Sequence, residues 1–443
     1  MADRSGRTTR SMERFEDGEA SGPVAGGVRR IGPLPSVAAR VDEGIPLRVL
    51  RLCSVFEPAS GQLVAARFDP VGGMQTHTGE LTRALDGRGV RQLVVTTRPP
   101  GAPQRERFGA HGGVVRLGLP VPLFRQGYAW PAAGVLVRAV SRVELLHAHL
   151  GEDLAVVPLA LAAARWGRCP LVLTVHTSVR HTVAVTGPRS AVLKSWGGWW
   201  EQVGERRADA VIALTPRLAG LVTGAGVPAQ RVHVIPSGVP DGLFDAPSAV
   251  EPVGLPPRPR AVFLGRLHVQ KGVDVLMRAV AMLPGVQLVL AGDGPERDAL
   301  RRLVASLGIG DRVRFLGFVP RTQVPGLLAA ADVLVLPSRY EELGTAVIEG
   351  MRAGVPVVAA DTGGVSATVT DGVTGLLVPP GQPAALAAAL RRVLTDDGLA
   401  RRLAVTARRR SRAYSWEALA ARGLGVYRAG LGDVAGRRAG SLG

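Results

Sequence analysis

The chain has 443 residues, of which 46% are hydrophobic, and this length is sufficient for two domains with separate cores. Its formal net charge is +18, yet only two of its 54 basic residues are lysines, Lys194 and Lys271. An arginine-rich, lysine-poor composition is what a GC-rich genome produces, and no stretch interleaves arginines with aromatic residues. Composition therefore excludes a mostly disordered chain and gives little support to a nucleic-acid partner.

Cysteine usage and hydropathy favour an intracellular setting. Two cysteines, Cys53 and Cys169, are too few for a disulfide framework or a metal site. No apolar run reaches the roughly 18 residues typical of a transmembrane helix. Residues 1–46 lack the apolar core of a secretory signal, so we expect a disordered N-terminal arm. We expect a cytoplasmic protein with at most peripheral membrane contact, through the arginines between residues 401 and 412.

The first predicted domain, residues 47–245, opens with a βαβ pattern. An apolar run at residues 47–55 predicts a strand, residues 75–85 a helix, and a second strand follows, which favours a parallel sheet. Gly72 and Gly73 lie between the first strand and the helix, at the edge where open α/β sheets bind ligands. They form neither a dinucleotide fingerprint nor a P-loop. A tight turn and a ligand-binding loop both fit this pair.

Later strands of this domain are followed by histidines and a basic loop. His149 lies just after a predicted strand, and His176 follows the strand predicted at residues 171–175. Such histidines are often structural, bonded to the backbone, and His176 is the better candidate for a site. Arg180 and His181 follow in a predicted loop. From their spacing alone, we expect this loop to cover a bound substrate.

Two further signals mark the end of the first domain. Residues 190–207 predict an amphipathic helix with three tryptophans, of which at least one is expected to pack in the core. Thr215 followed by Pro216 predicts a helix N-cap. Residues 246–260, rich in Pro, Ala, Val and Gly, read as a linker.

The second predicted domain, residues 261–412, begins with a strand and a basic loop. Arg266 and Lys271 lie five residues apart in that loop, and both can reach one anion. Alone, such a pair is commonly a surface feature, but lysine is nearly absent elsewhere. Residues 413–430 predict a C-terminal helix, and residues 431–443 a flexible tail.

The most informative stretch is residues 334–358, which reads as strand, loop, helix and strand. The helix begins near Gly344, where free backbone amides favour a phosphate. Glu341 lies in the loop and Glu349 on the polar helix face, about 12 Å away if all eight steps are helical. Solvated acids, with Glu349 paired to Arg352, are the simpler alternative.

The spacing of Glu341 and Glu349, with Gly354 and Pro356 after them, resembles the signature of retaining glycosyltransferases of family GT4. The loop of Arg266 and Lys271 resembles that family's cationic element, and the whole resemblance covers about residues 47–430. It implies an α/β protein of the GT-B fold, with two Rossmann-like parallel-sheet domains facing a central cleft. It also implies that the last helix crosses back to the first domain.

The resemblance also implies site roles. Glu341 would contact the donor sugar and Glu349 the ribose, while Arg266 and Lys271 would neutralise the diphosphate. His176 would lie near the reacting sugar, with His149, Arg180 and His181 as weaker acceptor candidates. The remaining donor contacts would come from Gly72, Gly73, Gly317, Phe318, Val319, Gly344, Thr345 and Ala346.

The implied activity is transfer of a sugar from a UDP- or GDP-linked donor to an acceptor hydroxyl, with retention and without a metal or other cofactor. The acceptor would be a small polyol, such as an aminocyclitol or inositol phosphate, or else a lipid or polysaccharide. A sugar-nucleotide epimerase, a phosphorylase and a non-catalytic basic binding protein are the alternatives. Ala367 stands where the family usually has Glu, and Ser237 where it commonly has Asn.

Overall fold

The structure is a computed structural model that describes residues 46–57, 73–118, 127–151, 153–182, 187–240, 242–244 and 254–440. Gly72, nearly all of the predicted N-terminal arm and residues 246–253 of the predicted linker lie outside these ranges.

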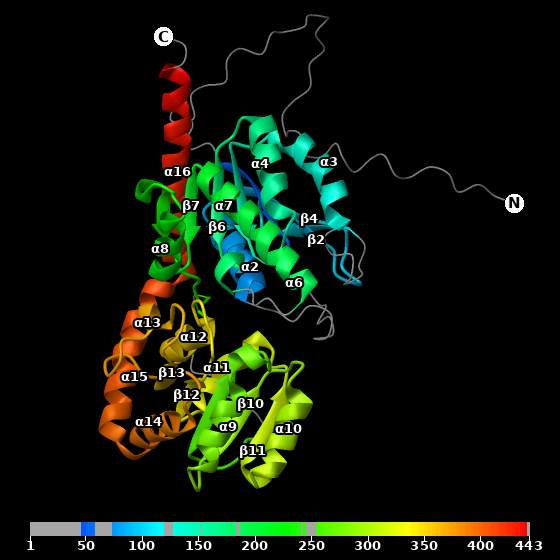
Figure 1. The fold of residues 1–443 in the computed structure, drawn as a ribbon. Helices are drawn as coiled ribbons and strands as arrows, with labels where there is room; N and C mark the ends of the chain where they lie inside the picture. The colour runs from blue at the N-terminus through cyan, green and yellow to red at the C-terminus, as the bar shows by residue number, and fades with distance from the viewer. Residues whose placement is uncertain are drawn as a thin grey trace, which may run out of the picture. The chain divides into compact units, whose positions relative to one another are not determined.

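The first domain is built on an eight-stranded sheet in the order β3-β4-β2-β1-β5-β6-β7-β8 (Figure 1). All its strand pairs are parallel except β3 with β4. The parallel sheet predicted from the opening βαβ pattern is therefore present. The strands are β1 (Arg48–Cys53), β2 (Arg91–Thr97), β3 (Arg105–Phe108), β4 (Gly112–Leu117), β5 (Leu145–Leu150), β6 (Leu171–Val175), β7 (Ala210–Ala213) and β8 (Val232–Val234).

Helices cover both faces of this sheet because successive strand residues point to opposite faces and both sets are apolar. Leu50 packs among α3, α4, α7 and α8, whereas its neighbour Val49 packs among α2 and α16. The first face carries α3 (Ala129–Val140), α4 (Val156–Gly167), α7 (Gly198–Arg207) and α8 (Pro216–Gly224), and the second α2 (Gly73–Asp86) and α16 (Trp416–Gly440).

The second domain has a six-stranded, fully parallel sheet in the order β11-β10-β9-β12-β13-β14. Phe263 on β9 packs toward one layer of helices and Val262 toward the other. The strands are β9 (Arg260–Leu264), β10 (Gln287–Ala291), β11 (Val313–Gly317), β12 (Val333–Leu336), β13 (Val357–Ala360) and β14 (Leu376–Val378).

The helices of the second domain form two layers. One contains α9 (Val273–Ala281), α10 (Arg297–Ser306), α14 (Pro383–Thr395) and α15 (Asp397–Ser411). The other contains α11 (Val324–Ala329), α12 (Thr345–Ala353) and α13 (Val365–Thr368). Two Rossmann-like domains with parallel sheets confirm the predicted α/β fold class.

Several element boundaries differ from those predicted. The first domain also contains the β3–β4 hairpin, for which the sequence predicts no strands. The tryptophan-rich segment is broken into α6 (Pro188–Val192), a π-helical turn (Leu193–Gly197) and α7, and Trp200 packs in the core as expected. Thr215 is the predicted N-cap of α8, since its Oγ accepts a hydrogen bond from the Leu218 amide at 3.2 Å.

The segment predicted as a tail from residue 431 is helical as far as Gly440, because α16 continues to that residue. Leu431 gives the physical reason: it is 4% exposed and packs with Tyr427 against the first sheet, so the helix gains buried apolar surface beyond residue 430. This segment is rich in arginine and glycine, so its sequence gives no apolar helical pattern from which the packing could be predicted.

Candidate active site

The start of α12 is built as the sequence predicts, with β12 before it and β13 after it. Gly344 is the N-cap residue in the left-handed region, with φ of +74°, a conformation that favours glycine. The first amides of a helix have no acceptor within the helix, and they carry its positive dipole end. Thr345 and Ala346, the first two helical residues, therefore present backbone donors suited to an anion.

Gly73 places the start of a second helix beside the first. It is the first residue of α2, and a Cβ atom built on it would lie 3.9 Å from Oγ1 of Thr345. The structure thus brings together the predicted glycine loop of the first domain and the predicted phosphate seat of the second.

Lys271 and Glu341 form an ion pair at the same place. The Lys271 ammonium donates to Oε2 of Glu341, and the Ser338 hydroxyl lies 3.5 Å from the same oxygen. Their loops are held together by the backbone, since the Arg339 amide donates to the Gln270 carbonyl at 2.8 Å. The second domain thus joins Lys271, the predicted cation, to Glu341, the glutamate expected to contact the donor sugar, 70 residues away in sequence.

A glycine pair fixes the backbone of Glu341. The Gly364 amide donates to the Glu341 carbonyl at 3.0 Å. Gly363 has φ of +59°, and a Cβ atom on it would lie 1.9 Å from that carbonyl oxygen. Any side chain at residue 363 would displace Glu341, so the glycine is required by the approach of two backbones.

Arg266 lies in the same loop as Lys271, between β9 and the short 3₁₀ turn at Val269–Lys271. Its side chain is exposed. No contact between this side chain and Lys271 or Glu341 is present among the described residues, so its role as a second cation stays a prediction.

Glu349 lies on α12, half-buried, and its surroundings disfavour its charge. Burial raises the pKa of Glu349 to about 7, an effect only partly opposed by the Arg321 guanidinium. Arg321 also forms an ion pair of 2.8 Å with Glu80 of α2, while its Nε and Nη2 are buried and have no partner among the described residues. Desolvated acids of this kind are enriched at functional sites.

The loop after β11 leads into Arg321. Gly317 has φ of +73°, and its carbonyl accepts a hydrogen bond of 2.7 Å from the Gly292 amide. Phe318 is 43% exposed and Val319 is partly buried. These three predicted donor contacts therefore lie close in sequence to Arg321, the arginine that acts on Glu349.

A buried histidine cluster occupies the carboxyl edge of the first sheet. His149 lies near the C-terminal end of β5, and His176 directly follows β6. The distance between Nδ1 of His149 and Nε2 of His176 is 3.1 Å. His77 of α2 stacks edge-on against His176, at 4.6 Å between ring centroids. The ligand nitrogens of these three histidines lie within 4.8 Å of one another. Sequence spacing did not reveal this group, since three separate elements contribute to it.

Arg180 and His181 are placed differently from the prediction. They lie in the short helix α5 (Val179–Thr182) and not in an open loop. The Arg180 guanidinium donates to Glu201 at 3.1 Å and to Glu205 at 2.6 Å, and both acids are fully buried on α7. His181 is exposed, with its Nδ1 2.8 Å from the Ser178 hydroxyl. Arg180 is therefore engaged by two carboxylates.

Glu342 was missed by sequence reasoning, which assigned it no role in the site. It is 6% exposed and accepts hydrogen bonds from the Thr215 hydroxyl at 2.6 Å and from Arg217 at 3.0 Å. The Tyr340 hydroxyl donates to the same carboxylate. Glu342 thus joins the loop before α12 to Thr215 at the start of α8, a contact that no local sequence signal indicates.

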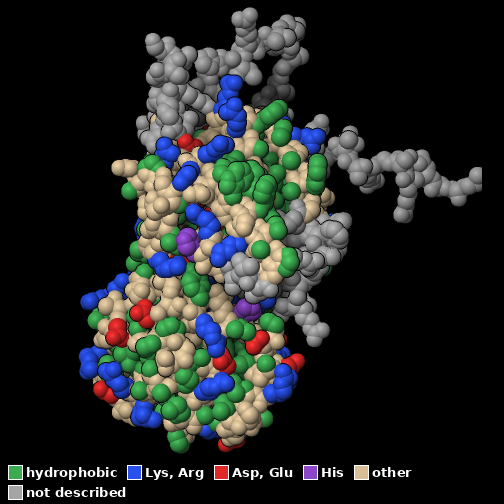
Figure 2. Space-filling view, in the orientation of Figure 1, with side chains coloured by type: hydrophobic (Ala, Val, Ile, Leu, Met, Phe, Trp, Pro, Cys, Tyr) green, Lys and Arg blue, Asp and Glu red, His purple; other side chains and the backbone are tan. Residues whose placement is uncertain are grey.

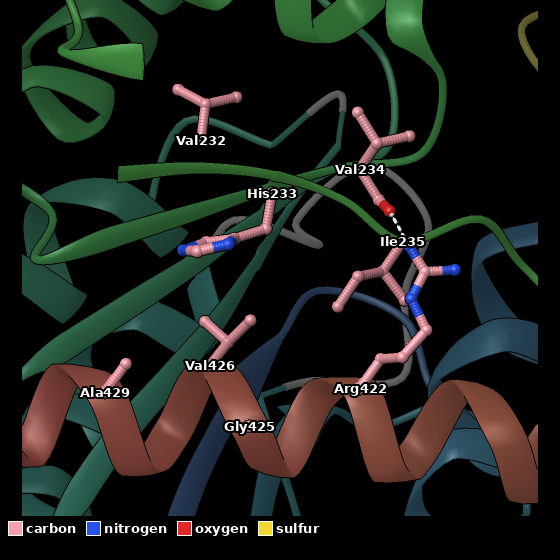
Figure 3. A pocket seen from close by; sticks show the side chains of 8 residues that line it. All are labelled: Val232, His233, Val234, Ile235, Arg422, Gly425, Val426 and Ala429. Carbon is pink, nitrogen blue, oxygen red and sulfur yellow. Dashed lines mark hydrogen bonds between the residues drawn. The ribbon is translucent and has the colours of Figure 1, made fainter. Parts of the chain in front are cut away.

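A cavity of about 440 Å³ lies away from all of these residues, between β8 and α16 (Figure 3). Its lining is mainly apolar, and the Arg422 guanidinium donates to the Val234 carbonyl beside it. The residues that line it include no predicted site residue. They are Val232, His233, Val234, Ile235, Arg422, Gly425, Val426 and Ala429.

The basic residues do not gather into a single patch on the face drawn in Figure 2, where Lys and Arg side chains are scattered among apolar and acidic ones. Within the part of the chain that the structure describes, no helix combines the length and apolar character needed to cross a bilayer.

Comparisons with known proteins agree with this geometry. Residues 71–242 match the family described as Glycosyltransferase Family 4, and residues 251–410 match the one described as Glycosyl transferases group 1. The 2-deoxystreptamine N-acetyl-D-glucosaminyltransferase of Streptomyces fradiae is 35% identical over 79% of this chain and 89% of that relative. The D-inositol 3-phosphate glycosyltransferase of Xylanimonas cellulosilytica is 35% identical over 80% of this chain and 91% of that relative.

A solved structure is similar over most of the chain. Sucrose-phosphate synthase from Thermosynechococcus elongatus superposes with a TM-score of 0.73 and 26% identity, covering 86% of this chain and 98% of that one. The chain has two Rossmann-like domains, and the Lys271–Glu341 ion pair lies near the starts of α2 and α12. Together with the similarity to this solved structure, these features define a glycosyltransferase of the GT-B type. Because these relatives are 35% identical over about four fifths of the chain, the chain belongs to the family 4 glycosyltransferases.

Proposed function

We propose that this enzyme transfers a sugar from a nucleotide diphosphate sugar to a hydroxyl of an aminocyclitol, with retention at the anomeric carbon and without a metal ion. The observation that carries the proposal is the junction of Lys271, Glu341 and the start of α12, to which Gly73 of the first domain is adjacent. This arrangement combines a cation, free helix amides and a carboxylate, the groups that a leaving diphosphate and its sugar require.

The chemical difficulty is charge that develops as the bond from the anomeric carbon to the diphosphate breaks. The Lys271 ammonium and the first amides of α12 stabilise the negative charge on the leaving oxygens, with Arg266 as the second cation. Glu341 orients Lys271 through their ion pair and contacts the donor sugar. The charge stabilisation that a divalent ion gives elsewhere comes here from side chains and amides, so we expect transfer to persist in a chelator.

The nucleotide would lie along the second domain. Glu349 accepts hydrogen bonds from the ribose, and the backbone of Gly317, Phe318 and Val319 contacts the base. The raised pKa of Glu349 supports this role, since ribose hydroxyls supply the hydrogen bonds that water cannot give a desolvated carboxylate. Both UDP- and GDP-sugars fit a site that reads the base through backbone groups.

The acceptor proposal rests on relatives and on Arg180. One relative is named for 2-deoxystreptamine and another for D-inositol 3-phosphate, and both acceptors are cyclitols. Arg180 is held by Glu201 and Glu205, so this candidate phosphate ligand is already neutralised. We therefore favour a cyclitol that carries amines over one that carries a phosphate.

The test is a matrix of UDP- and GDP-sugars against 2-deoxystreptamine and inositol 3-phosphate, with EDTA present and products identified by mass spectrometry. We expect a glycosylated aminocyclitol whose anomeric configuration, read by proton coupling in NMR, equals that of the donor. Inverted product would contradict retention, and preference for inositol 3-phosphate would contradict the acceptor class. Loss of all transfer in EDTA, restored by a divalent ion, would contradict metal independence.

A further inference from the structure

Arg51 is an unusual residue in the interior of the first sheet. It lies on β1, directly opposite His147 of β5, and it is 1% exposed. No carboxylate pairs with its guanidinium among the described residues, although a buried charge is normally compensated in this way. Burial accordingly lowers the pKa of Arg51 below its usual value. Burying the Arg51 guanidinium costs desolvation free energy, so we expect a function that explains its position.

The guanidinium is anchored at one end and directed at a histidine at the other. Its Nη1 donates to the Thr82 hydroxyl and lies 3.3 Å from the Thr78 carbonyl, both on α2. Its Nη2 lies 2.5 Å from Nε2 of His149. A guanidinium carries donors only, so Nε2 of His149 must be the acceptor and carries no proton.

The assignment then propagates along the cluster. A neutral imidazole has one N–H, so the proton of His149 lies on Nδ1. This Nδ1 lies 3.1 Å from Nε2 of His176, to which it donates. Nε2 of His176 is therefore an acceptor, and the proton of His176 lies on Nδ1, which has no partner among the described residues.

We propose that Arg51 and His149 are positioning residues that hold His176 in the Nδ1–H tautomer, so that it donates a hydrogen bond to an oxygen of the substrate. The inference rests on the proposed function for the identity of that substrate. His176 lies at the right place: its ring packs against His77, which is one helical turn from Gly73 on α2. Gly73 in turn adjoins Thr345 at the start of α12.

The charges around His176 keep it neutral as well as oriented. The titratable groups in the cluster are Arg51 and Cys53 on β1, His147 and His149 on β5, His77 on α2 and Tyr427 on α16. None of these is a carboxylic acid that would favour imidazolium. Asp153, the carboxylate that acts on Cys53, is not among the charges that shift the pKa of His176 within the described part of the chain. Burial, with the charge of Arg51 added, lowers the pKa of His176 to about 3. His176 thus serves as a neutral donor at physiological pH and not as a general acid.

A metal ion is the competing occupant of His77, His149 and His176. Binding it would require the lone pair of His149 that Arg51 already uses, and it would place a cation beside a buried guanidinium. The geometry therefore points to the hydrogen-bonded chain. Zinc titration monitored by calorimetry is the direct comparison, because a stoichiometric, tight zinc site that is lost in His77→Ala would overturn the assignment.

The tautomer itself is measured without substrate, by histidine-selective ¹⁵N NMR of the whole protein. We expect a single Nδ1–H tautomer for His176 in the wild type. In Arg51→Met we expect mixed tautomers for His149 and His176. We expect a weaker effect in Thr82→Val, which removes one of the two partners of Nη1 of Arg51 and leaves the Thr78 carbonyl. Thr174→Val is the matched control, since Thr174 lies 2.7 Å from Nε2 of His147, which is outside the chain of bonds.

Kinetics supply the second readout. We expect Arg51→Met to lower kcat roughly 10-fold to 100-fold with a nearly unchanged KM for the donor, because a bond that strengthens in the transition state is lost. Arg51→Lys, which still donates, should restore part of the rate, and Thr174→Val should retain it. An Nε2–H tautomer of wild-type His176, or a tautomer unchanged in both Arg51→Met and Thr82→Val, would overturn the inference. If the tautomers behave as expected but no donor and acceptor pair is turned over, the proposed function fails alone.

Discussion

Replacing Glu349 by Gln should make the protein more stable while it weakens donor binding. The pKa of Glu349 in the folded protein is about 7, against an ordinary value of 4.5. Between these two values the folded state binds more protons than the unfolded state, so the free energy of unfolding falls as pH rises through this window. Glutamine has the same shape but no charge, so the variant does not incur this cost.

The magnitude follows from the same two values. A difference of about 2.5 in pKa corresponds to at most about 3 to 4 kcal/mol at 1.36 kcal/mol per pH unit. Glu349 is only half-buried, so partial hydration reduces the effect to ~2 kcal/mol. We therefore expect the wild type and Glu349→Gln to have similar urea midpoints at pH 4.5. At pH 8 the midpoint of the variant should be higher by an amount equivalent to ~2 kcal/mol.

Glu417→Gln is the matched control, because the Glu417 side chain on α16 is 80% exposed and remains hydrated in the folded protein. Its urea midpoint should follow that of the wild type at every pH. In calorimetry, Glu349→Gln should also weaken UDP or GDP binding by about 10-fold, which corresponds to one lost charged hydrogen bond of ~1.5 kcal/mol. Equal pH dependence of stability in wild type and Glu349→Gln would refute the reasoning about desolvation. Unchanged nucleotide affinity would remove Glu349 from the ribose site.

Four other substitutions test the site. Lys271→Ala should weaken nucleotide diphosphate binding about 10-fold to 100-fold, measured by calorimetry, whereas the control Lys194→Ala should not. Equal dissociation constants for the wild type and Lys271→Ala would refute the phosphate site. Glu341→Gln should abolish transfer in the mass-spectrometric assay with little change in thermal stability, and wild-type turnover would exclude it from the mechanism. Gly363→Ala should destroy activity by displacing Glu341, whereas Gly381→Ala, also at positive φ but in open space, should only lower stability by ~1 kcal/mol. Glu342→Ala should lower the free energy of unfolding by ~2 kcal/mol, measured by urea denaturation, because it leaves the buried Thr215 hydroxyl without its acceptor.

Local patterns in the sequence predicted those parts of the site that one stretch of chain builds. The apolar strand before Pro337, the glycine at residue 344 and the helical spacing after it specify the start of α12, which the structure contains. Thr215 followed by Pro216 likewise specifies a helix start through local hydrogen bonding. Lys271 was singled out because lysine is scarce; the structure places it in an ion pair with Glu341, and its contact with a diphosphate stays a prediction.

The parts that could not be predicted depend on contacts between distant residues. His77 lies on a helix with no histidine pattern, and only the packing of α2 on the first sheet brings it to His149 and His176. Glu342 and Thr215 are 127 residues apart, and nothing local distinguishes Glu342 from a solvated acid. The C-terminal helix was predicted too short for the same reason, since the partners of Leu431 lie on the first sheet.

Three polar groups that are costly to bury are connected, directly or through a neighbour, to one helix, α2. Among the described residues, Arg51 is a buried cation with no paired acid, Glu349 is a desolvated acid, and Arg321 keeps two buried nitrogens without a partner. Each is connected to α2: Arg51 through Thr82, and Arg321, which acts on Glu349, through Glu80. Apolar residues of similar size would make a more stable core at these positions. Their presence around the helix that begins at Gly73 therefore argues that this junction is maintained for substrate and not for folding.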